Sequence, residues 1–597
     1  MDASTPAGTW FLAANAFRLE MSIHAAGPGF VGTIKNEGGA AEPLDNITWD
    51  PASRWLEFRR NGPGFFQWYR ICLTYGVMAG RFSHALAAAK PALTSYTSHV
   101  TGWSPDWLDS GIVPRTWNVT ISNRYRAVLR IDRDSSNALI GRLKVFDDSA
   151  TAGVQEELED DLQSITWDGV HLTFTRSAGF TQVYHGTVSG RFISGTFTHN
   201  GGPATPWNGA RGEVLGFGLG SRLSQRDVWQ TATRGRIVNL TEGMRLVNVG
   251  IPPVTVADLG PAGPFPGAYP AERDDDPGSW PPAYTIRHLR FTVSPGSRFD
   301  PANPPPPRVF DGYLATPTGP VPPGGFRTLV AVNGHGGSAQ QIMTASNDAY
   351  WYGESAARRD LMVLAVDIGH RPHWASGPIV HNPIVDAGYA DSNWEEDGER
   401  TFSVRRAIDW LLGQTNARRD RLFMAGLSLG GEVTTITGGL DPRIGMAVVA
   451  GFSPDMNVMD VYGNHPCYRW DHADVHEYLD VSDWEALTAP RPLLVETGKL
   501  DGTFSARTPP FSGDKQLTRR ARAAYGPDAA KLIHYLHYDV HHFHVGAANP
   551  TNPGRQQRIQ AAAAIDPVVP GDQTWQTDGA TTVRSPSLYH LMNEFLP

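Results

Sequence analysis

Residues 421–432 read RLFMAGLSLGGE. An apolar run ends at Gly426, and Ser428 follows between this glycine and Gly430. A serine placed on a sharp turn from a strand into a helix needs small residues two positions before and after it, because larger side chains would collide with the turn. The pattern therefore predicts that Ser428 is a nucleophile on a strand-to-helix turn.

The segments on either side of this turn alternate between apolar strands and helical patterns. Strands are predicted at 327–337, 360–369, 446–452 and 491–498. A helix is predicted from apolar residues that share one face, namely Val404, Ala407, Ile408, Leu411 and Leu412. Continuous apolar strands that alternate with helices are typical of a mostly parallel sheet covered on both faces. We therefore place residues 285–597 in the α/β class, as a doubly wound domain.

A serine hydroxyl needs a general base, and in this arrangement the acid and then the histidine follow the serine along the chain. Asp501 comes shortly after the strand at 491–498 and is the favoured acid, with Asp455, one strand earlier, as the alternative. The base is expected in the loop after the last strand, where we favour His541. The other histidines of that loop are His542 and His544.

Two backbone N–H groups are expected to stabilise the oxyanion that forms during attack on a carbonyl group. One belongs to Leu429, which follows the serine at the start of a helix, where the helix dipole favours an anion. The other is expected in the glycine-rich loop 333–338, which reads NGHGGS. Within that loop we place the donor at Gly336 or Gly337.

The first third of the chain contains an internal repeat. Residues 46–84 and 164–199 both begin close to the sequence ITWD, and both carry Gly-Phe, Tyr, Gly, Phe and His at matching places. Apolar and polar residues alternate at period two between Gly, Asn and Asp, which is typical of short antiparallel strands. We predict two all-β modules, each a small barrel or a sandwich, at 1–104 and 105–214. Residues 215–284 are rich in Gly and Pro and are interpreted as an extended surface connection.

Composition sets wider limits. The chain has 597 residues, too many for one core, and its net charge of −9 argues against nucleic acid as the main partner. No apolar run approaches the ~20 residues that cross a bilayer. The N-terminus has no signal-peptide pattern, which suits either a cytoplasmic protein or a secreted one without its leader. Two cysteines exclude a disulfide framework. The oligomeric state stays open.

Four motifs together resemble the α/β-hydrolases related to dienelactone hydrolases and bacterial acetyl xylan esterases. They are NGHGGS (333–338), GLSLGGE (426–432), YLDVSDWEALTAPRPLLVETGKLDGTF (478–504) and HHFH (541–544). In the third and most specific motif, the family's Ala-Pro-Arg-Pro leads a strand to the catalytic Asp, with a Phe three residues later, which are the positions of Asp501 and Phe504. The resemblance covers residues 285–597. It differs at Val540, where the family has a glycine before the base, so His542 stays open as the base.

Other histidine-rich segments have several interpretations. The loop 369–383 follows a strand end, where such folds bind ligands. We take His370 and Trp374 of this loop, and His335 of the glycine-rich loop 333–338, as candidate substrate contacts. A second cluster has residue types that suit zinc, namely His465, Cys467, His472 and His476. The resemblance places that cluster in an excursion before the acid strand, so we predict neither a metal site nor a cofactor.

The leading hypothesis is a serine carboxylic-ester hydrolase with an acyl-enzyme intermediate, acting on acetylated carbohydrates or on other small or polymeric esters. A peptidase or amidase with the same triad is the alternative enzyme, and a non-catalytic binding protein on a hydrolase scaffold is the alternative class. The β modules lie outside the resemblance and are only similar to small barrels of the avidin or lipocalin type. They are expected either to bind a polymer or to have a structural role.

Overall fold

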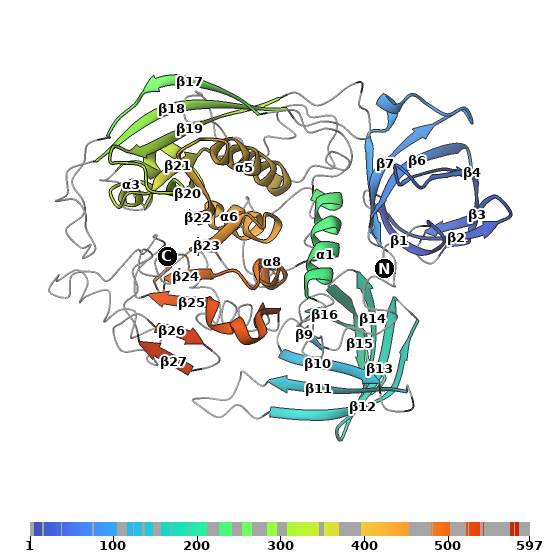
Figure 1. The fold of residues 1–597 in the computed structure, drawn as a ribbon. Helices are drawn as coiled ribbons and strands as arrows, with labels where there is room; N and C mark the ends of the chain where they lie inside the picture. Colours follow the sequence, from blue (N-terminus) through green and yellow to red (C-terminus); the bar gives the residue numbers. More distant parts are fainter. Residues whose placement is uncertain are drawn as a thin grey trace. The chain divides into compact units, whose positions relative to one another are not determined.

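The computed structural model describes residues 5–103, 116–146, 157–211, 226–241, 254–265, 283–294, 302, 307–344, 352–368, 396–452, 479, 481–498, 500–501, 521–537, 541, 574–577 and 580–583, apart from gaps of one or two residues inside these ranges. The chain divides into two compact units near residue 244. Figure 1 shows the helices and strands with their labels.

The first module is a closed antiparallel barrel. Its strands are β1 (Gly8–Ala14), β2 (Phe17–Ala26), β3 (Gly29–Asn36), β4 (Glu42–Asp50), β5 (Trp55–Gly62), β6 (Phe65–Thr74), β7 (Val77–Ala85) and β8 (Ser98–Trp103), with the 3-10 turn η1 (Leu93–Ser95) before β8. Each strand pairs with the next, and β1 pairs with β8, where Phe11 lies opposite Trp103. Closure leaves no open sheet edge in the barrel.

The second module is also a closed barrel. Its strands are β9 (Thr116–Ile121), β10 (Tyr125–Arg133), β11 (Leu139–Phe146), β12 (Glu157–Trp167), β13 (His171–Ser177), β14 (Thr181–Ser189), β15 (Phe192–His199) and β16 (Thr205–Arg211). The ring closes between β16 and β9, where Trp207 lies opposite Ile121. The sequence left a barrel and a sandwich open for these modules, and both modules are barrels.

Both barrels hold the same stack of three aromatic rings in the interior. In the first barrel the ring of Tyr69 stacks on Phe58, with centroids 4.7 Å apart, and on Phe82, at 5.1 Å. In the second barrel Tyr184 stacks in the same way on Phe174 and Phe197. The matching residues of the internal repeat therefore fill the two barrels with the same core.

A polar network at the phenol end of each stack is also duplicated. In the first barrel Arg60 bonds to Glu42 at 2.7 Å, and the Tyr69 hydroxyl donates to Gln67 Oε1 at 3.0 Å. The counterparts in the second barrel are Arg176, Asp160, Tyr184 and Gln182. Burial raises the pKa of Tyr69 to about 12, so the phenol keeps its proton and remains a donor. This shared arrangement gives the tyrosine hydroxyl and the arginine guanidinium the same kinds of partner in both barrels.

Residues 215–284, expected to form an extended connection, contain regular elements where the structure describes them. Helix α1 (Arg226–Thr241) contacts β6 and β7 and buries Trp229 and Ile237. Strand β17 (Thr255–Pro261) pairs with β18 (Tyr284–Val293), so the sheet of the α/β domain starts before residue 285. Neither element was predicted from the sequence. The segment is rich in Gly and Pro, and α1 has only a short apolar stripe.

The α/β domain contains an eleven-stranded sheet, in the order β17-β18-β19-β21-β20-β22-β23-β24-β25-β26-β27. The strands after β17 are β18 (Tyr284–Val293), β19 (Arg308–Pro317), β20 (Phe326–Val332), β21 (Met362–Val366), β22 (Ala417–Leu427), β23 (Ile444–Ala450), β24 (Leu493–Gly498), β25 (Leu532–His537), β26 (Thr574–Thr577) and β27 (Ala580–Val583). The strands from β21 to β25 in this order are parallel. Their carboxyl ends therefore meet at one edge of the sheet.

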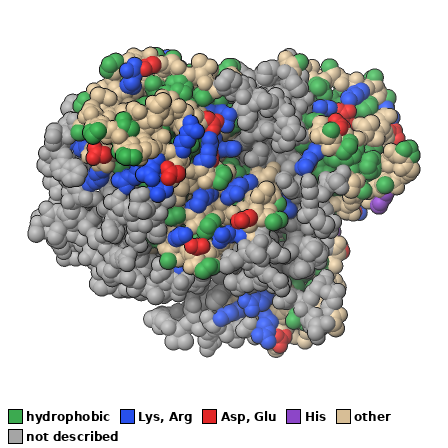
Figure 2. All heavy atoms as spheres, in the orientation of Figure 1, with side chains coloured by type: hydrophobic (Ala, Val, Ile, Leu, Met, Phe, Trp, Pro, Cys, Tyr) green, Lys and Arg blue, Asp and Glu red, His purple; other side chains and the backbone are tan. Residues whose placement is uncertain are grey.

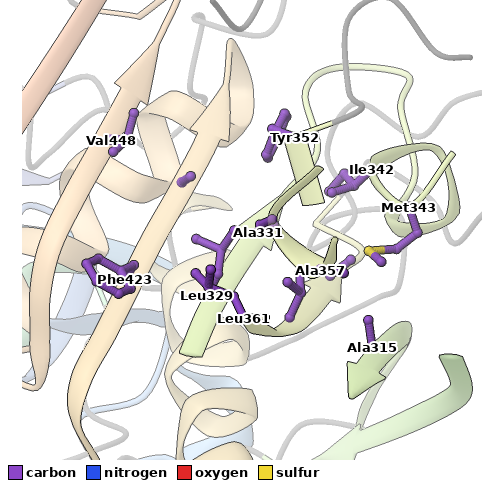
Figure 3. Packing of buried hydrophobic residues seen from close by; sticks show 14 of the residues in the cluster. Ala315, Leu329, Ala331, Ile342, Met343, Tyr352, Ala357, Leu361, Phe423 and Val448 are labelled. Carbon is purple, nitrogen blue, oxygen red and sulfur yellow. The ribbon is translucent and has the colours of Figure 1, made fainter. Parts of the chain in front are cut away.

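Helices cover both faces of this sheet, as the sequence predicts. They are α2 (Ala339–Ile342), α3 (Tyr352–Ala357), α5 (Glu396–Leu412), α6 (Leu429–Leu440) and α8 (Val481–Thr488), with the 3-10 turn η6 (Gly526–Lys531) before β25. Leu329 and Ala331 of β20 belong to the core that includes Ile342 of α2 and Tyr352 of α3, part of which is drawn in Figure 3. Helix α6 contacts β20, β22, β23, α5 and α8.

Arg491, from the Ala-Pro-Arg-Pro motif, anchors the carboxyl end of α6. Its guanidinium donates to the backbone carbonyls of Gly438 at 2.6 Å, Asp441 at 3.0 Å and Ile444 at 2.7 Å. The last carbonyls of a helix have no partner within the helix, and a cation there also complements the helix dipole. Arg491 thus joins the segment that leads into β24 to the helix that follows Ser428.

Asp441, the buried acid that follows α6, pairs with arginines that reach the surface. Burial opposes ionisation of Asp441, but hydrogen bonds and charges from Arg443 and Arg405 outweigh it and lower the pKa of Asp441. Arg443 also reaches Asp409 of α5 at 2.5 Å. Figure 2 shows Lys and Arg side chains interspersed with Asp and Glu side chains over α5 and α6. These pairs tie α5 to the end of α6.

Replacement of Arg491 by alanine is expected to lower the free energy of unfolding by about 2–4 kcal/mol, because three charge-assisted hydrogen bonds to backbone carbonyls are lost. Arg418→Ala is the matched control. Its guanidinium bonds to Asp420, which is 65% exposed, and such a surface pair contributes at most about 1 kcal/mol. Chemical denaturation of both variants measures the difference. Equal losses would show that Arg491 does not anchor α6.

Candidate active site

Ser428 lies directly between β22 and α6, on the turn that the sequence predicts. Its backbone has φ 59° and ψ −120°, a left-handed conformation that non-glycine residues rarely adopt. The Ser428 N–H donates to the carbonyl of Ala450 at 2.8 Å, which holds the turn against the end of β23. The side chain makes no capping hydrogen bond to α6. The hydroxyl is therefore not used to stabilise the helix that begins beside it.

The glycines around Ser428 are required by backbone that approaches them. A Cβ atom at Gly426 would collide with the carbonyl of Gly430. At Gly430 it would lie 2.5 Å from the Val332 carbonyl oxygen, and at Gly431 it would lie 2.8 Å from that of Ala450. Such approaches are too close for any side chain. The G-x-S-x-G pattern thus reflects how tightly the turn packs between β20 and β23.

Asp501 and His541 are brought together from loops 40 residues apart. Nδ1 of His541 lies 2.6 Å from Oδ2 of Asp501. Asp501 is fully buried, and its N–H donates to Gly498 at the end of β24. The His541 side chain is 25% exposed. A carboxylate can only accept a hydrogen bond, so Asp501 favours the His541 tautomer with the proton on Nδ1.

Gly451 connects this pair to the serine turn. A Cβ atom at Gly451 would lie 2.8 Å from Cε1 and 2.9 Å from Nδ1 of His541, so the imidazole lies directly against this glycine. The preceding residue, Ala450, accepts the hydrogen bond from the Ser428 N–H. Ser428 and His541 therefore contact consecutive residues, Ala450 and Gly451, at the end of β23. In the sequence Gly451 only follows an apolar strand, and nothing there marks it as part of the site.

The glycine-rich loop after β20 forms a tight turn. The N–H of Gly337 donates to the carbonyl of Gly334 at 3.0 Å, and Gly336 has φ 70°. A positive φ at the third residue is the feature of a type II turn, in which the N–H of that residue is not part of the turn's own hydrogen bond. Of the two glycines considered as donors, Gly337 thus already donates within the turn. The other expected donor, Leu429, is the first residue of α6, where N–H groups lack an acceptor within the helix.

Several residues singled out in the sequence lie outside the described residues. These are Asp455, His370, Trp374, His542, His544, and the histidines and cysteine at 465–476. His335 is described and lies partly buried at the second position of the turn 334–337. His534 is buried in β25, and its Nε2 lies 3.0 Å from the Thr497 hydroxyl of β24.

Within the described residues, no group of three or more His, Cys, Asp and Glu side chains is arranged to hold a metal ion. In the same part of the chain, no helix is both long enough and apolar enough to cross a membrane.

Sequence comparison gives one family match. The model of a family described as "Abhydrolase family" matches residues 389–545, the stretch that contains Ser428, Asp501 and His541. None of the curated protein sequences matches the chain. Together with the strand order and the turn at Ser428, this match assigns the second unit to the α/β-hydrolase fold, as the sequence predicts.

Solved structures of several esterases are similar to this chain at low identity. A candidate acetyl xylan esterase from Bacteroides fragilis is 16% identical, with 56% of this chain and 78% of that chain covered and a TM-score of 0.38. A promiscuous CE15 esterase from a marine bacterial metagenome is 15% identical, with 54% and 84% covered and a TM-score of 0.35. A glucuronoyl esterase from Solibacter usitatus is 14% identical, with 50% and 80% covered and a TM-score of 0.32.

Proposed function

We propose that the chain is a serine carboxylic-ester hydrolase with Ser428 as nucleophile, His541 as general base and Asp501 as the acid that orients it. The observation that carries this proposal is the pair His541–Asp501, which packs on Gly451 beside the residue that holds the Ser428 turn. The strained backbone at Ser428 lowers the stability of the fold by about 1–3 kcal/mol. Its side chain does not cap the helix, so a structural role at the helix end does not explain the serine.

In the proposed reaction, Nε2 of His541 takes the proton of the Ser428 hydroxyl as Oγ attacks the ester carbonyl. The carbonyl oxygen becomes an oxyanion, held by the N–H groups of Leu429 and of the turn 334–337. The tetrahedral species collapses, the C–O bond of the ester breaks, and His541 returns the proton to the departing alcohol. Water, deprotonated by the same histidine, then releases the acid from the acyl-enzyme. Asp501 stabilises the imidazolium at both stages.

The substrates that we propose are acetylated carbohydrates and other small or polymeric esters, following the resemblance of the motifs at 333–338, 426–432 and 478–504. A peptidase or amidase with the same residues is the alternative enzyme. The same residues argue against a binding protein, which would not need an ordered serine, acid and histidine. For the barrels, interiors filled by aromatic stacks favour a structural role over polymer binding.

A fluorophosphonate probe tests the proposal directly, because it phosphonylates only a serine that an adjacent base activates. We expect one labelled site in the full chain, located at Ser428 by peptide mass spectrometry. The labelled chain should then be assayed with acetyl esters, longer acyl esters, aromatic esters and peptide amides. Labelling without hydrolysis of any ester would favour the amidase, and absence of labelling would favour the binding protein.

A further inference from the structure

We infer that Asn333 and Asp367 are positioning residues that hold the N–H of Gly336 as the second oxyanion donor. The inference rests on the proposed function and deepens it, because it assigns the residues that fix a backbone group in place. A backbone donor stabilises an oxyanion only if it is held in position before the reaction, so that no reorganisation occurs as charge develops. The glycine-rich turn must therefore be fixed at both of its ends.

The near end of the turn is held by the side chain of Asn333, which is fully buried. Its Nδ2 donates to the Gly334 carbonyl at 2.9 Å, and its Oδ1 accepts from the N–H of Ile368 at 3.0 Å. Ile368 lies two residues beyond the end of β21, the neighbouring parallel strand. One amide side chain thus ties the start of the turn to the adjacent strand.

The far end of the turn is held to the same place. The N–H of Ala339 donates to Oδ1 of Asp367 at 2.5 Å, and Asp367 is buried. Ser338 and Gln341 form a capping box, in which each side chain accepts from the other residue's N–H. The turn between Asn333 and Ala339 is therefore anchored at both ends to the consecutive residues Asp367 and Ile368.

The hydrogen bonds inside the turn select one donor. The Gly334 carbonyl accepts from both Gly337 N–H and Asn333 Nδ2, so Gly337 is committed to the turn itself. Gly336 has φ 70°, its N–H lies outside the turn's own hydrogen bond, and a Cβ atom there would have no neighbour within 4 Å among the described residues. An approaching substrate oxygen can reach the N–H of Gly336 without disturbing the turn.

The anchored loop also touches the serine turn. A Cβ atom at Gly430 would lie 2.5 Å from the carbonyl oxygen of Val332 and 2.7 Å from that of Asn333. The chain thus passes from its contact with the nucleophile turn straight into Asn333. A shift at Asn333 would therefore change the distance between the two donors, Leu429 and Gly336, which must point at one oxygen atom.

The test compares an ester with its thiono analogue, in which sulfur replaces the carbonyl oxygen. Sulfur accepts hydrogen bonds weakly, so an enzyme with a well-placed oxyanion site prefers the oxygen ester strongly. We expect Asn333→Ala to lower kcat/KM for the oxygen ester roughly 10- to 100-fold, mainly through kcat, and to leave the thionoester rate nearly unchanged. The oxygen-to-sulfur preference should fall by the same factor.

Thr328→Ala is the matched control, since Thr328 is a buried polar residue at the opposite end of β20 and bonds to Arg421. It should keep the wild-type preference even if it lowers stability. If Asn333→Ala does not fold, Asn333→Ser, whose hydroxyl is too short to bridge both partners, replaces it. Loss of activity on both esters in equal proportion would overturn the inference. A wild-type chain inactive on every ester would instead refute the proposed function, and the inference with it.

Discussion

Replacement of Ser428 by alanine should lower kcat for ester hydrolysis by roughly 10⁴- to 10⁶-fold, because the covalent route is lost and only the oxyanion donors remain. The fold should survive, since the side chain makes no capping hydrogen bond to α6 and the turn is held through the backbone bond to Ala450. Steady-state kinetics and fluorophosphonate labelling of the purified variant measure this. Residual hydrolysis above about one per cent would show that another group attacks the ester.

Ser428→Gly separates the chemistry from the backbone strain. Glycine adopts φ 59° freely, whereas serine and alanine do not. We therefore expect the glycine variant to be as inactive as the alanine variant but more stable, by about 1 kcal/mol in the free energy of unfolding. A glycine variant less stable than wild type would mean that the serine side chain has a structural role at the turn.

The serine turn was readable from the sequence because its constraints are local. A side chain at position 426 would collide with the Gly430 carbonyl, only four residues away. Both partners of this contact therefore lie within one short motif. Asp501 was a candidate for a related reason, since it comes shortly after a strongly apolar strand. The strands of the barrels were likewise visible from the alternation of apolar residues.

Contacts between distant segments could not be read in this way. The packing of His541 on Gly451 joins residues 90 positions apart, and nothing near either residue records it. Closure of the first barrel depends on β1 pairing with β8, which a sandwich would not require. Asn333 was noticed only as the start of a glycine-rich loop, because its partner Ile368 lies beyond a different strand. Helix α1 escaped because Gly and Pro residues dominate the segment around it.

Replacement of Asp501 by asparagine should lower kcat by roughly 10³- to 10⁴-fold, with a much smaller change in KM. The carboxylate accepts from Nδ1 of His541 at 2.6 Å and so keeps the proton on that nitrogen, whereas an amide can donate to Nδ1 and leave Nε2 protonated. The size of Asn is the same, so the buried site should keep its packing. Kinetics over a range of pH measure the loss.

Asp441→Asn is the control for that variant, because Asp441 is a buried carboxylate that pairs with Arg443 at the end of α6, away from the strand ends that carry the site. It should cost stability but change kcat by less than about threefold. Alanine at His541 should match the loss caused by Asp501→Asn or exceed it, whereas alanine at His542 should not. If His542→Ala is the more damaging variant, the base is His542, and the bond between His541 and Asp501 then only holds the loop in place.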